Sequence, residues 1–168
     1  MAHDKSCFFT GHRILPTGEL PKICIKLDRE IENMITKNGV TDFFCGGALG
    51  FDMLAAERVL AAREKFEGIQ LIMALPCRNQ TEKWRNGAEI RRYENILSKA
   101  DFVFYICEEY EKGCMYKRNR FMADRSKFGI AYRTHYHGGT DYTVKYAQEI
   151  GCEMTFIADV PKKPLPFL

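Results

Sequence analysis

Glycines and polar residues form short runs that each follow an apolar segment of strand length. The run Cys45–Asp52 passes from such a segment into a helical pattern, and backbone N–H groups at the start of a helix bind phosphate well. It predicts a phosphate loop or, alternatively, a glycine turn that lets helix and sheet pack closely. Asp52 in the first turn is expected to cap the helix or, as the second choice, to accept a ribose hydroxyl. The candidate ligand-binding residues of this run are Gly46, Gly47, Ala48, Gly50 and Asp52.

The first apolar segment ends in Thr10-Gly11-His12-Arg13. A hydroxyl, a small backbone and a fixed cation at one strand end suit a phosphate oxygen or a base, with Arg13 as the charge partner. The alternative is that His12 is an exposed turn residue and Arg13 an ordinary surface cation. The position of the run after a strand favours binding.

Helical spacing in Cys114–Met122 places Arg118 and Asn119 on the face that carries the apolar residues. Burying an arginine without partners is costly, so Arg118 is expected to meet a carboxylate, backbone carbonyls or a bound anion, with Asp124 as one internal partner. A hydrogen-bonded pair that orients the loops without touching a ligand explains the pattern equally well. Tyr116 in the same run is a further candidate ligand contact.

Gly138-Gly139-Thr140 is expected to lead into a helix over 142–148 and to offer a second set of backbone donors to an anion. Thr140 is alternatively the N-cap of that helix. His135 and His137 lack a third ligand nearby, so no metal site is predicted. In the segment after the third strand, an adenine is expected to stack on Trp84 or to be held by Gln80, although a lone tryptophan more commonly fills a core.

Apolar strand-length runs alternate with segments of helical period along the whole chain. Strands are predicted at 7–9, 42–45, 69–75, 102–106, 129–132 and 154–157, with helical patterns over 23–34, 51–66, 90–100 and 143–150. This alternation predicts a Rossmann-like, doubly wound α/β fold with a mostly parallel sheet and helices on both faces. One domain over residues 1–160 is expected, followed by an irregular tail over 161–168. The polar runs then share the carboxyl edge of the sheet and form one cleft.

Composition limits the class of protein. The 168 residues are 46% hydrophobic and 28% charged, which suits one compact domain, and a net charge of +3 is modest for a protein that covers duplex nucleic acid. The seven cysteines include no CxxC pair, which favours a reducing compartment. Because the N-terminus lacks an apolar signal core and no apolar stretch approaches about 20 residues, a cytoplasmic protein without a membrane segment is expected.

Taken in series, these motifs resemble the YpsA-like branch of the SLOG superfamily. The matching runs are Phe9–Arg13, Gly46–Asp52, Tyr116-x-Arg118-Asn119-x-x-Met122 and Gly138–Thr140. The resemblance implies a Rossmann-like fold that binds a nucleotide or a nucleotide-derived ligand. The superfamily includes the LOG phosphoribohydrolases and the single-strand DNA-binding protein DprA, so the resemblance leaves the activity open.

The hydrolase motif of the LOG enzymes, PGGxGTxxE, is altered in this chain. His137 replaces its proline, and its catalytic glutamate has no clear counterpart, although Asp141 could substitute if the loop were shifted. The resemblance therefore does not carry hydrolase activity over to this sequence, and catalytic residues are unassigned.

Three functions follow. The first is a sensor or regulatory module that binds ADP-ribose or an NAD-like ligand, with a protein partner or a second copy of the chain. The second is a nucleotide N-glycosidase with Asp141 or Glu109 as its carboxylate. The third is a single-strand nucleic-acid binder, against which the acidic run Glu108–Glu111 argues. No cofactor is assigned beyond the nucleotide ligand itself. The candidate aromatic and basic contacts for the third function are Trp84, Tyr110, Lys112, Tyr116, Lys117, Arg118 and Arg120.

Overall fold

The computed structural model describes residues 2–160. Strands and helices alternate along this part of the chain, with short 3-10 turns at His3–Lys5 and Thr17–Glu19. The elements are β1 (Ser6–Gly11), α1 (Leu20–Asn38), β2 (Asp42–Cys45), α2 (Phe51–Arg63), β3 (Gln70–Cys77), α3 (Gly87–Lys99), β4 (Phe102–Cys107), α4 (Cys114–Asp124), β5 (Phe128–Tyr132), α5 (Gly138–Glu149) and β6 (Glu153–Ala158).

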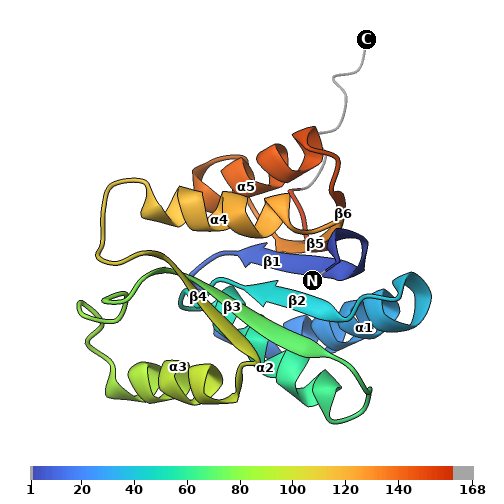
Figure 1. Cartoon of the computed structure of the whole chain (residues 1–168), viewed down its shortest axis with the longest axis horizontal. Coiled ribbons are helices and arrows are strands. Elements are labelled where there is room, and N and C mark those ends of the chain that lie inside the picture. The colour runs from blue at the N-terminus through green and yellow to red at the C-terminus, as the bar shows by residue number, and fades with distance from the viewer. Residues whose placement is uncertain (1, 161–168) are drawn as a thin grey trace.

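The six strands form one sheet in the order β4-β3-β2-β1-β5-β6, and every neighbouring pair is parallel. Helices α1, α2 and α3 cover one face of the sheet, and α4 and α5 cover the other (Figure 1). The chain builds outward from β1 to β4, then returns to the other side of β1 through β5 and β6. The predicted doubly wound Rossmann-like fold is confirmed.

Consecutive phenylalanines explain why the inner strands are buried on both faces. Side chains of a strand alternate between the faces of its sheet. Phe9 and Phe43 accordingly pack in the core under α1 to α3, whereas their neighbours Phe8 and Phe44 pack in the core under α4 and α5. All four side chains are fully buried, and each contributes roughly 1.5–3 kcal/mol to folding. These strands fix the sheet that positions the loops at its edge.

Most element boundaries differ from the sequence predictions by a few residues, but the last helix differs in a way that matters. Helix α5 begins at Gly138, four residues before the predicted start at Tyr142, so the glycines form its first turn. The expected tail over 161–168 lies outside the described residues. All seven cysteines are unpaired. Within residues 2–160, no helix is long and apolar enough to cross a membrane.

Candidate functional site

The strand order changes direction at β1, which lies between β2 and β5. The connections that leave β1 and β5 run to opposite faces of the sheet, which opens a crevice at the carboxyl ends of these strands. The arrows of β1 and β2 point toward this edge, at the left of Figure 1. The polar runs singled out in the sequence all follow strands at this edge.

Two adjoining cavities lie in the crevice, and Arg13, Ala48 and Met115 line both of them. The larger, here called the aromatic chamber, has a volume of about 520 Å³, and the smaller, here called the polar chamber, about 240 Å³. The aromatic chamber is further lined by Leu49, Cys77, Asn79, Gln80, Glu82, Lys83, Trp84 and Tyr110. The polar chamber is further lined by Thr10, Gly11, His12, Asp52, Arg118, Asn119, Gly139 and Thr140.

Most of the predicted site residues therefore meet at one place, but some do not line either chamber. Tyr116 is 42% exposed and its ring contacts that of Tyr142, with 4.7 Å between the centroids. These tyrosines lie on the surface formed by α4 and α5. The other predicted residues that line neither chamber are Gly46, Gly47, Gly50 and Gly138.

The glycines of the first two loops are there for packing. A Cβ atom on Gly11 would lie 2.4 Å from the ring of Phe51, and one on Gly47 would lie 2.6 Å from Leu75. Gly50 has a φ of +80°, and its Cβ would lie 2.2 Å from the backbone oxygen of Arg13. The alternative of close helix–sheet packing thus explains these glycines, although Ala48 of the same loop lines both chambers.

Gly139 differs from the glycines of the first two loops. A Cβ atom on Gly139 would meet no atom within 4 Å, and one on Gly138 would approach only the His135 ring, at 3.8 Å. Gly139 lines the polar chamber, and both residues belong to the first turn of α5, where backbone N–H groups have no partner within the helix. Among the predicted ligand-binding glycines, Gly139 at the N-terminus of α5 is therefore the one with free space at its Cβ position.

Arg118 is buried at 4% exposure and holds the first glycine loop. Its Nη1 donates to the carbonyl oxygen of Gly46, and its Nε donates to Asn119 Oδ1 at 2.7 Å. Among residues 2–160 no carboxylate lies within 4.0 Å of its guanidinium. The prediction of Asp124 as a partner is wrong, because Asp124 accepts a hydrogen bond from the Tyr146 hydroxyl at 2.5 Å.

Asp52 is buried in the wall of the polar chamber. Its Oδ2 accepts a hydrogen bond from the Ala48 N–H at 3.3 Å, and the N-cap of α2 is Gly50, so the predicted capping role is wrong. Asp52 lies two residues after the N-cap, inside the first turn, and its carboxylate fixes the loop before the helix instead. Burial raises the pKa of Asp52, while the positive charge of Arg118 and the Ala48 hydrogen bond oppose the rise.

His12 is held in a stack of three imidazoles. Its Nε2 accepts a hydrogen bond from the Thr134 N–H at 2.9 Å, and its Nδ1 lies 3.4 Å from Thr140 Oγ1. Its ring lies 4.3 Å from that of His135, which in turn lies 4.1 Å from that of His137. Burial and the two other histidines lower the pKa of His12. Because Nε2 accepts the Thr134 N–H, a neutral His12 ring carries its proton on Nδ1.

The early start of α5 also changes the role of Thr140. The N-cap of α5 is His137, so the prediction of Thr140 as N-cap is wrong, and its hydroxyl instead faces His12 across the polar chamber. In the described part of the chain, no group of three or more His, Cys, Asp or Glu side chains is placed to hold a metal ion.

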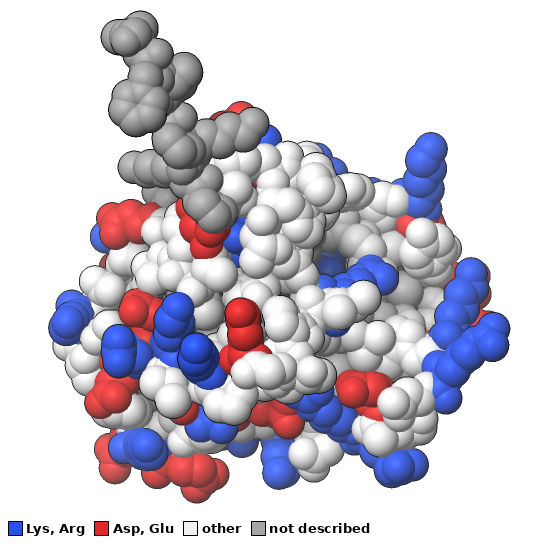
Figure 2. Space-filling model, turned by 180° about the vertical axis from the view of Figure 1, so that it is seen from behind, with Lys and Arg blue, Asp and Glu red and all other residues white. Residues whose placement is uncertain are grey.

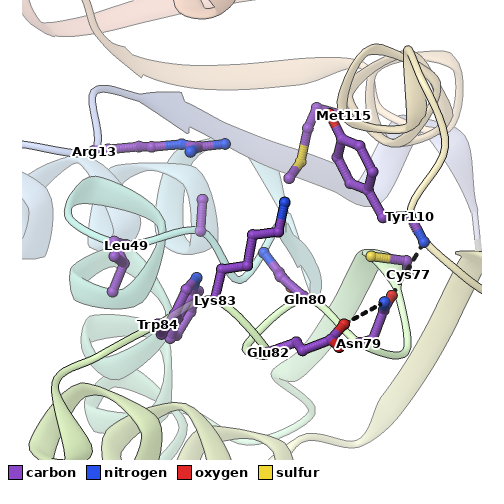
Figure 3. A pocket seen from close by; sticks show the side chains of 11 residues that line it. Arg13, Leu49, Cys77, Asn79, Gln80, Glu82, Lys83, Trp84, Tyr110 and Met115 are labelled. Carbon is purple, nitrogen blue, oxygen red and sulfur yellow. Dashed lines mark hydrogen bonds between the residues drawn. The ribbon is translucent and has the colours of Figure 1, made fainter.

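Figure 3 shows the aromatic chamber, with Arg13 and Lys83 extending into it from different sides. The half-buried ring of Trp84 packs edge-on against Tyr93, with 5.3 Å between centroids, and also lines the cavity. Trp84 thus packs against the core with one part of its ring and still presents surface to the cavity, so the two predicted roles do not exclude each other. Gln80 donates to the carbonyl oxygen of Gly47 and accepts from the Tyr93 hydroxyl, both at 3.3 Å.

Sequence reasoning missed several residues of the aromatic chamber, including Lys83, Asn79 and Leu49. Asn79 and Lys83 lie in the irregular segment between β3 and α3, where no periodicity marks the inward side chains. Leu49 belongs to the glycine loop but carries no polar atom. The one sequence feature that could have indicated Lys83 as a site residue is its position next to Trp84.

The carboxylates proposed for an N-glycosidase line neither chamber. Asp141 is buried and forms ion pairs with Arg133 at 3.2 Å and with Lys145 at 2.9 Å. Glu109 is exposed and lines a separate, shallow surface hollow. The carboxylates that do face the crevice are Asp52 and Glu82.

Comparison with known proteins supports the resemblance read from the motifs. A family model described as the YspA SLOG family, and named YpsA, matches residues 17–158. The SPbeta prophage-derived protein YoqJ of Bacillus subtilis is 30% identical over 140 residues, which cover 76% of this chain and 81% of YoqJ. A UPF0398 protein of Bacillus pumilus is 29% identical, with 77% of this chain and 70% of that protein covered.

Solved structures share the fold. DNA processing protein A from Helicobacter pylori, described as having a unique single-stranded DNA binding mode, superposes with a TM-score of 0.64 at 20% identity, over 92% of this chain and 65% of that chain. DNA processing protein A (DprA) from Streptococcus pneumoniae superposes with a TM-score of 0.63 at 18% identity, over 90% of this chain and 49% of that chain. This chain thus spans about two thirds and about half of these proteins. The motif series and the match over residues 17–158 together show that the chain belongs to the YpsA family of the SLOG superfamily.

Proposed function

We propose that the two chambers together hold a nucleotide or a nucleotide-derived ligand such as ADP-ribose or an NAD-like molecule. Its phosphate occupies the polar chamber and its base the aromatic chamber. The observation that carries this proposal is the junction of a glycine helix N-terminus with a buried arginine: Gly139 of α5 has open space in front of it, and Arg118 lines the same cavity without an ion pair in residues 2–160.

The electrostatics of the polar chamber favour an anion. The N-terminus of a helix carries a partial positive charge and offers free N–H donors. Arg118 adds a full positive charge in a buried setting, and Arg13 adds a second one at the boundary with the aromatic chamber. Asp52 works against an anion, but its carboxylate is held by the Ala48 N–H and faces Arg118. The balance of charges remains positive.

The aromatic chamber has the size and surface of a nucleoside site. Its volume of about 520 Å³ falls within the range of roughly 300–1,000 Å³ that is typical of small-molecule sites. Trp84, Tyr110 and Leu49 supply flat and apolar surfaces beside it. We assign the site to a binding or regulatory module in preference to an N-glycosidase, because Asp141 and Glu109 line neither chamber.

A single-stranded nucleic acid is the second candidate ligand. The related fold of the H. pylori protein and the cationic, aromatic lining of the aromatic chamber favour it. The acidic run that argued against it is partly neutralised, since Glu108 pairs with Arg78 at 2.8 Å and Glu111 with Lys117 at 2.5 Å. Figure 2 shows basic side chains in and around a hollow on the side of the molecule where the strands end.

Calorimetry with AMP, ADP, ADP-ribose, NAD and a short single-stranded oligonucleotide tests both candidates. The matched variants are Gly139→Ala and Gly139→Glu, because a Cβ atom at this position meets no atom within 4 Å. Glutamate puts a negative charge at the helix N-terminus, where it does not weaken the fold but repels a phosphate.

We expect a mononucleotide or dinucleotide to bind the wild type and the alanine variant, and the glutamate variant to bind at least about 10-fold more weakly. Assay of free base in the same samples separates binding from hydrolysis. Tight binding of the oligonucleotide alone would favour the second candidate. Nucleotide binding that is equal in all three proteins would contradict the polar chamber as the phosphate site.

A further inference from the structure

We propose that the cleft selects its ligand by phosphate charge and by stacking, without hydrogen bonds to the base edge, so that 5′-nucleotides of all four bases bind. This inference rests on the proposed nucleotide function and specifies the class of nucleotide. It follows from how the side chains of the aromatic chamber are already used.

Each end of the Gln80 amide already makes one hydrogen bond to the protein, and these two bonds fix its orientation. The Nε2 group donates to the Gly47 carbonyl oxygen at 3.3 Å, which ties the segment after β3 to the glycine loop after β2. The Oε1 atom accepts from the Tyr93 hydroxyl at 3.3 Å, which ties the same segment to α3. Turning the amide toward a base would break both links, and each lost hydrogen bond reduces affinity by about 2- to 10-fold.

Asn79 is committed in the same way. Its Nδ2 donates to Glu82 Oε2 at 2.9 Å, and its Oδ1 accepts from the Tyr110 N–H at 3.1 Å (dashed lines in Figure 3). These bonds join the segment after β3 to the segment after β4 and also engage the carboxylate of Glu82. The amides and the acid that line the chamber therefore brace its walls.

The remaining lining groups do not distinguish the bases. Trp84 and Tyr110 offer aromatic faces, and every base has a π-face that can stack on them. Arg13 and Lys83 extend into the cavity, and neither has a carboxylate within 4.0 Å in the described part of the chain. Arg13 also lines the polar chamber, where it suits the phosphate that all nucleotides share, and Lys83 adds positive charge beside it without a contact that singles out one base.

The expected selectivity follows because charged groups bind the phosphate and aromatic faces bind the base. A site that hydrogen-bonds a polar group of its substrate rejects an analogue without that group by about 10⁴- to 10⁵-fold, whereas an apolar pocket discriminates by about 10²-fold at most. We expect the dissociation constants of AMP, GMP, CMP and UMP to lie within about 10-fold of each other. Purines should bind more tightly than pyrimidines, because their larger rings bury more surface.

Calorimetric titration of the wild-type protein with AMP, GMP, CMP, UMP and adenosine tests the proposal. Adenosine should bind at least about 100-fold more weakly than AMP, because it lacks the phosphate. Arg13→Ala should weaken all four nucleotides by the same factor. Asn79→Ala should leave the ratios of the four dissociation constants unchanged within about 3-fold, whatever it does to their absolute values.

Two kinds of outcome would overturn the inference, and they differ in what they mean for the function. A preference of more than about 10-fold for one base, binding of adenosine as tight as that of AMP, or ratios that change in Asn79→Ala would refute selection by charge and stacking while leaving a nucleotide site in place. Absence of binding by all four nucleotides would refute the nucleotide function itself.

Discussion

Gly50→Ala tests whether the glycine loop after β2 is built for close packing. Gly50 has φ +80° and ψ −118°, a combination that residues with a Cβ atom rarely adopt. A Cβ atom there would lie 2.2 Å from the backbone oxygen of Arg13 and 2.7 Å from that of His12. Because these are backbone atoms, the whole β1 loop must move to admit the methyl group.

Two costs add up in this variant. The backbone conformation costs about 1–3 kcal/mol for alanine, and insertion of a methyl group into a packed contact costs about 1–3 kcal/mol more. The free energy of unfolding should therefore fall by about 2–6 kcal/mol. For a chain of this size, each kcal/mol shifts the Tm by roughly 2–4 °C, so the Tm should fall by about 4–24 °C.

Gly139→Ala is the matched control. Gly139 lies in the first turn of α5 with no atom within 4 Å of its Cβ position, so alanine should stabilise the protein by about 0.4–1 kcal/mol through the unfolded state. Urea unfolding followed by circular dichroism measures both variants. A Gly50→Ala protein as stable as the wild type, or a Gly139→Ala protein that is the less stable of the two, would refute the packing argument.

Three further variants test other contacts by urea unfolding. Arg118→Leu should lower the free energy of unfolding by about 1–3 kcal/mol, because it leaves the Gly46 carbonyl oxygen buried without its donor; an unchanged midpoint would contradict this. Arg133→Met should lower the free energy of unfolding by about 3–5 kcal/mol, because Asp141 loses a buried ion-pair partner. A loss under about 1 kcal/mol would contradict this and show that Lys145 alone compensates the charge of Asp141. The pKa of His12 is lowered in the fold by burial and by its neighbouring histidines, so its contribution to stability is complete above the unfolded value near 6.5 and is lost as the pH falls below it. Between pH 7.5 and 5.5, the free energy of unfolding of His12→Gln should therefore fall less than that of the wild type. Equal decreases in the two proteins would contradict a lowered pKa of His12 in the fold.

The fold could be predicted because its signals are local and periodic. Phe8, Phe9, Phe43 and Phe44 lie in runs that are apolar on both faces, which is typical of inner parallel strands. The glycine runs marked the ends of those strands. Because all the strands are parallel, this local information was enough to bring the polar segments to one edge of the sheet.

The roles of individual site residues were harder to predict, because they depend on contacts between distant segments. Asp52 was expected to cap its own helix, but it binds the Ala48 N–H. Arg118 was paired with Asp124, six residues away, whereas its partners include Gly46 from a different loop. Thr140 was predicted as an N-cap, but α5 begins at Gly138, so Thr140 lies inside the helix. None of these outcomes is visible in spacing alone.

The aromatic chamber was predicted least completely. Trp84 and Gln80 were singled out by residue type, but Lys83 was not, because the segment between β3 and α3 has no regular structure to indicate which side chains face inward. The acidic run after β4 was read as repelling nucleic acid, but ion pairs with Arg78 and Lys117 use two of its glutamates. Charges counted along the chain therefore did not reveal that two of these glutamates form ion pairs.

Amide NMR of the ¹⁵N-labelled protein during titration with AMP tests the central claim most directly. If the polar chamber binds the phosphate, the largest shifts will be those of the N–H groups of Gly139, Thr140 and Ala48, and the indole N–H of Trp84 will shift at the same AMP concentration. Shifts confined to other surfaces, or no shifts at millimolar AMP, would contradict a nucleotide site at this edge of the sheet.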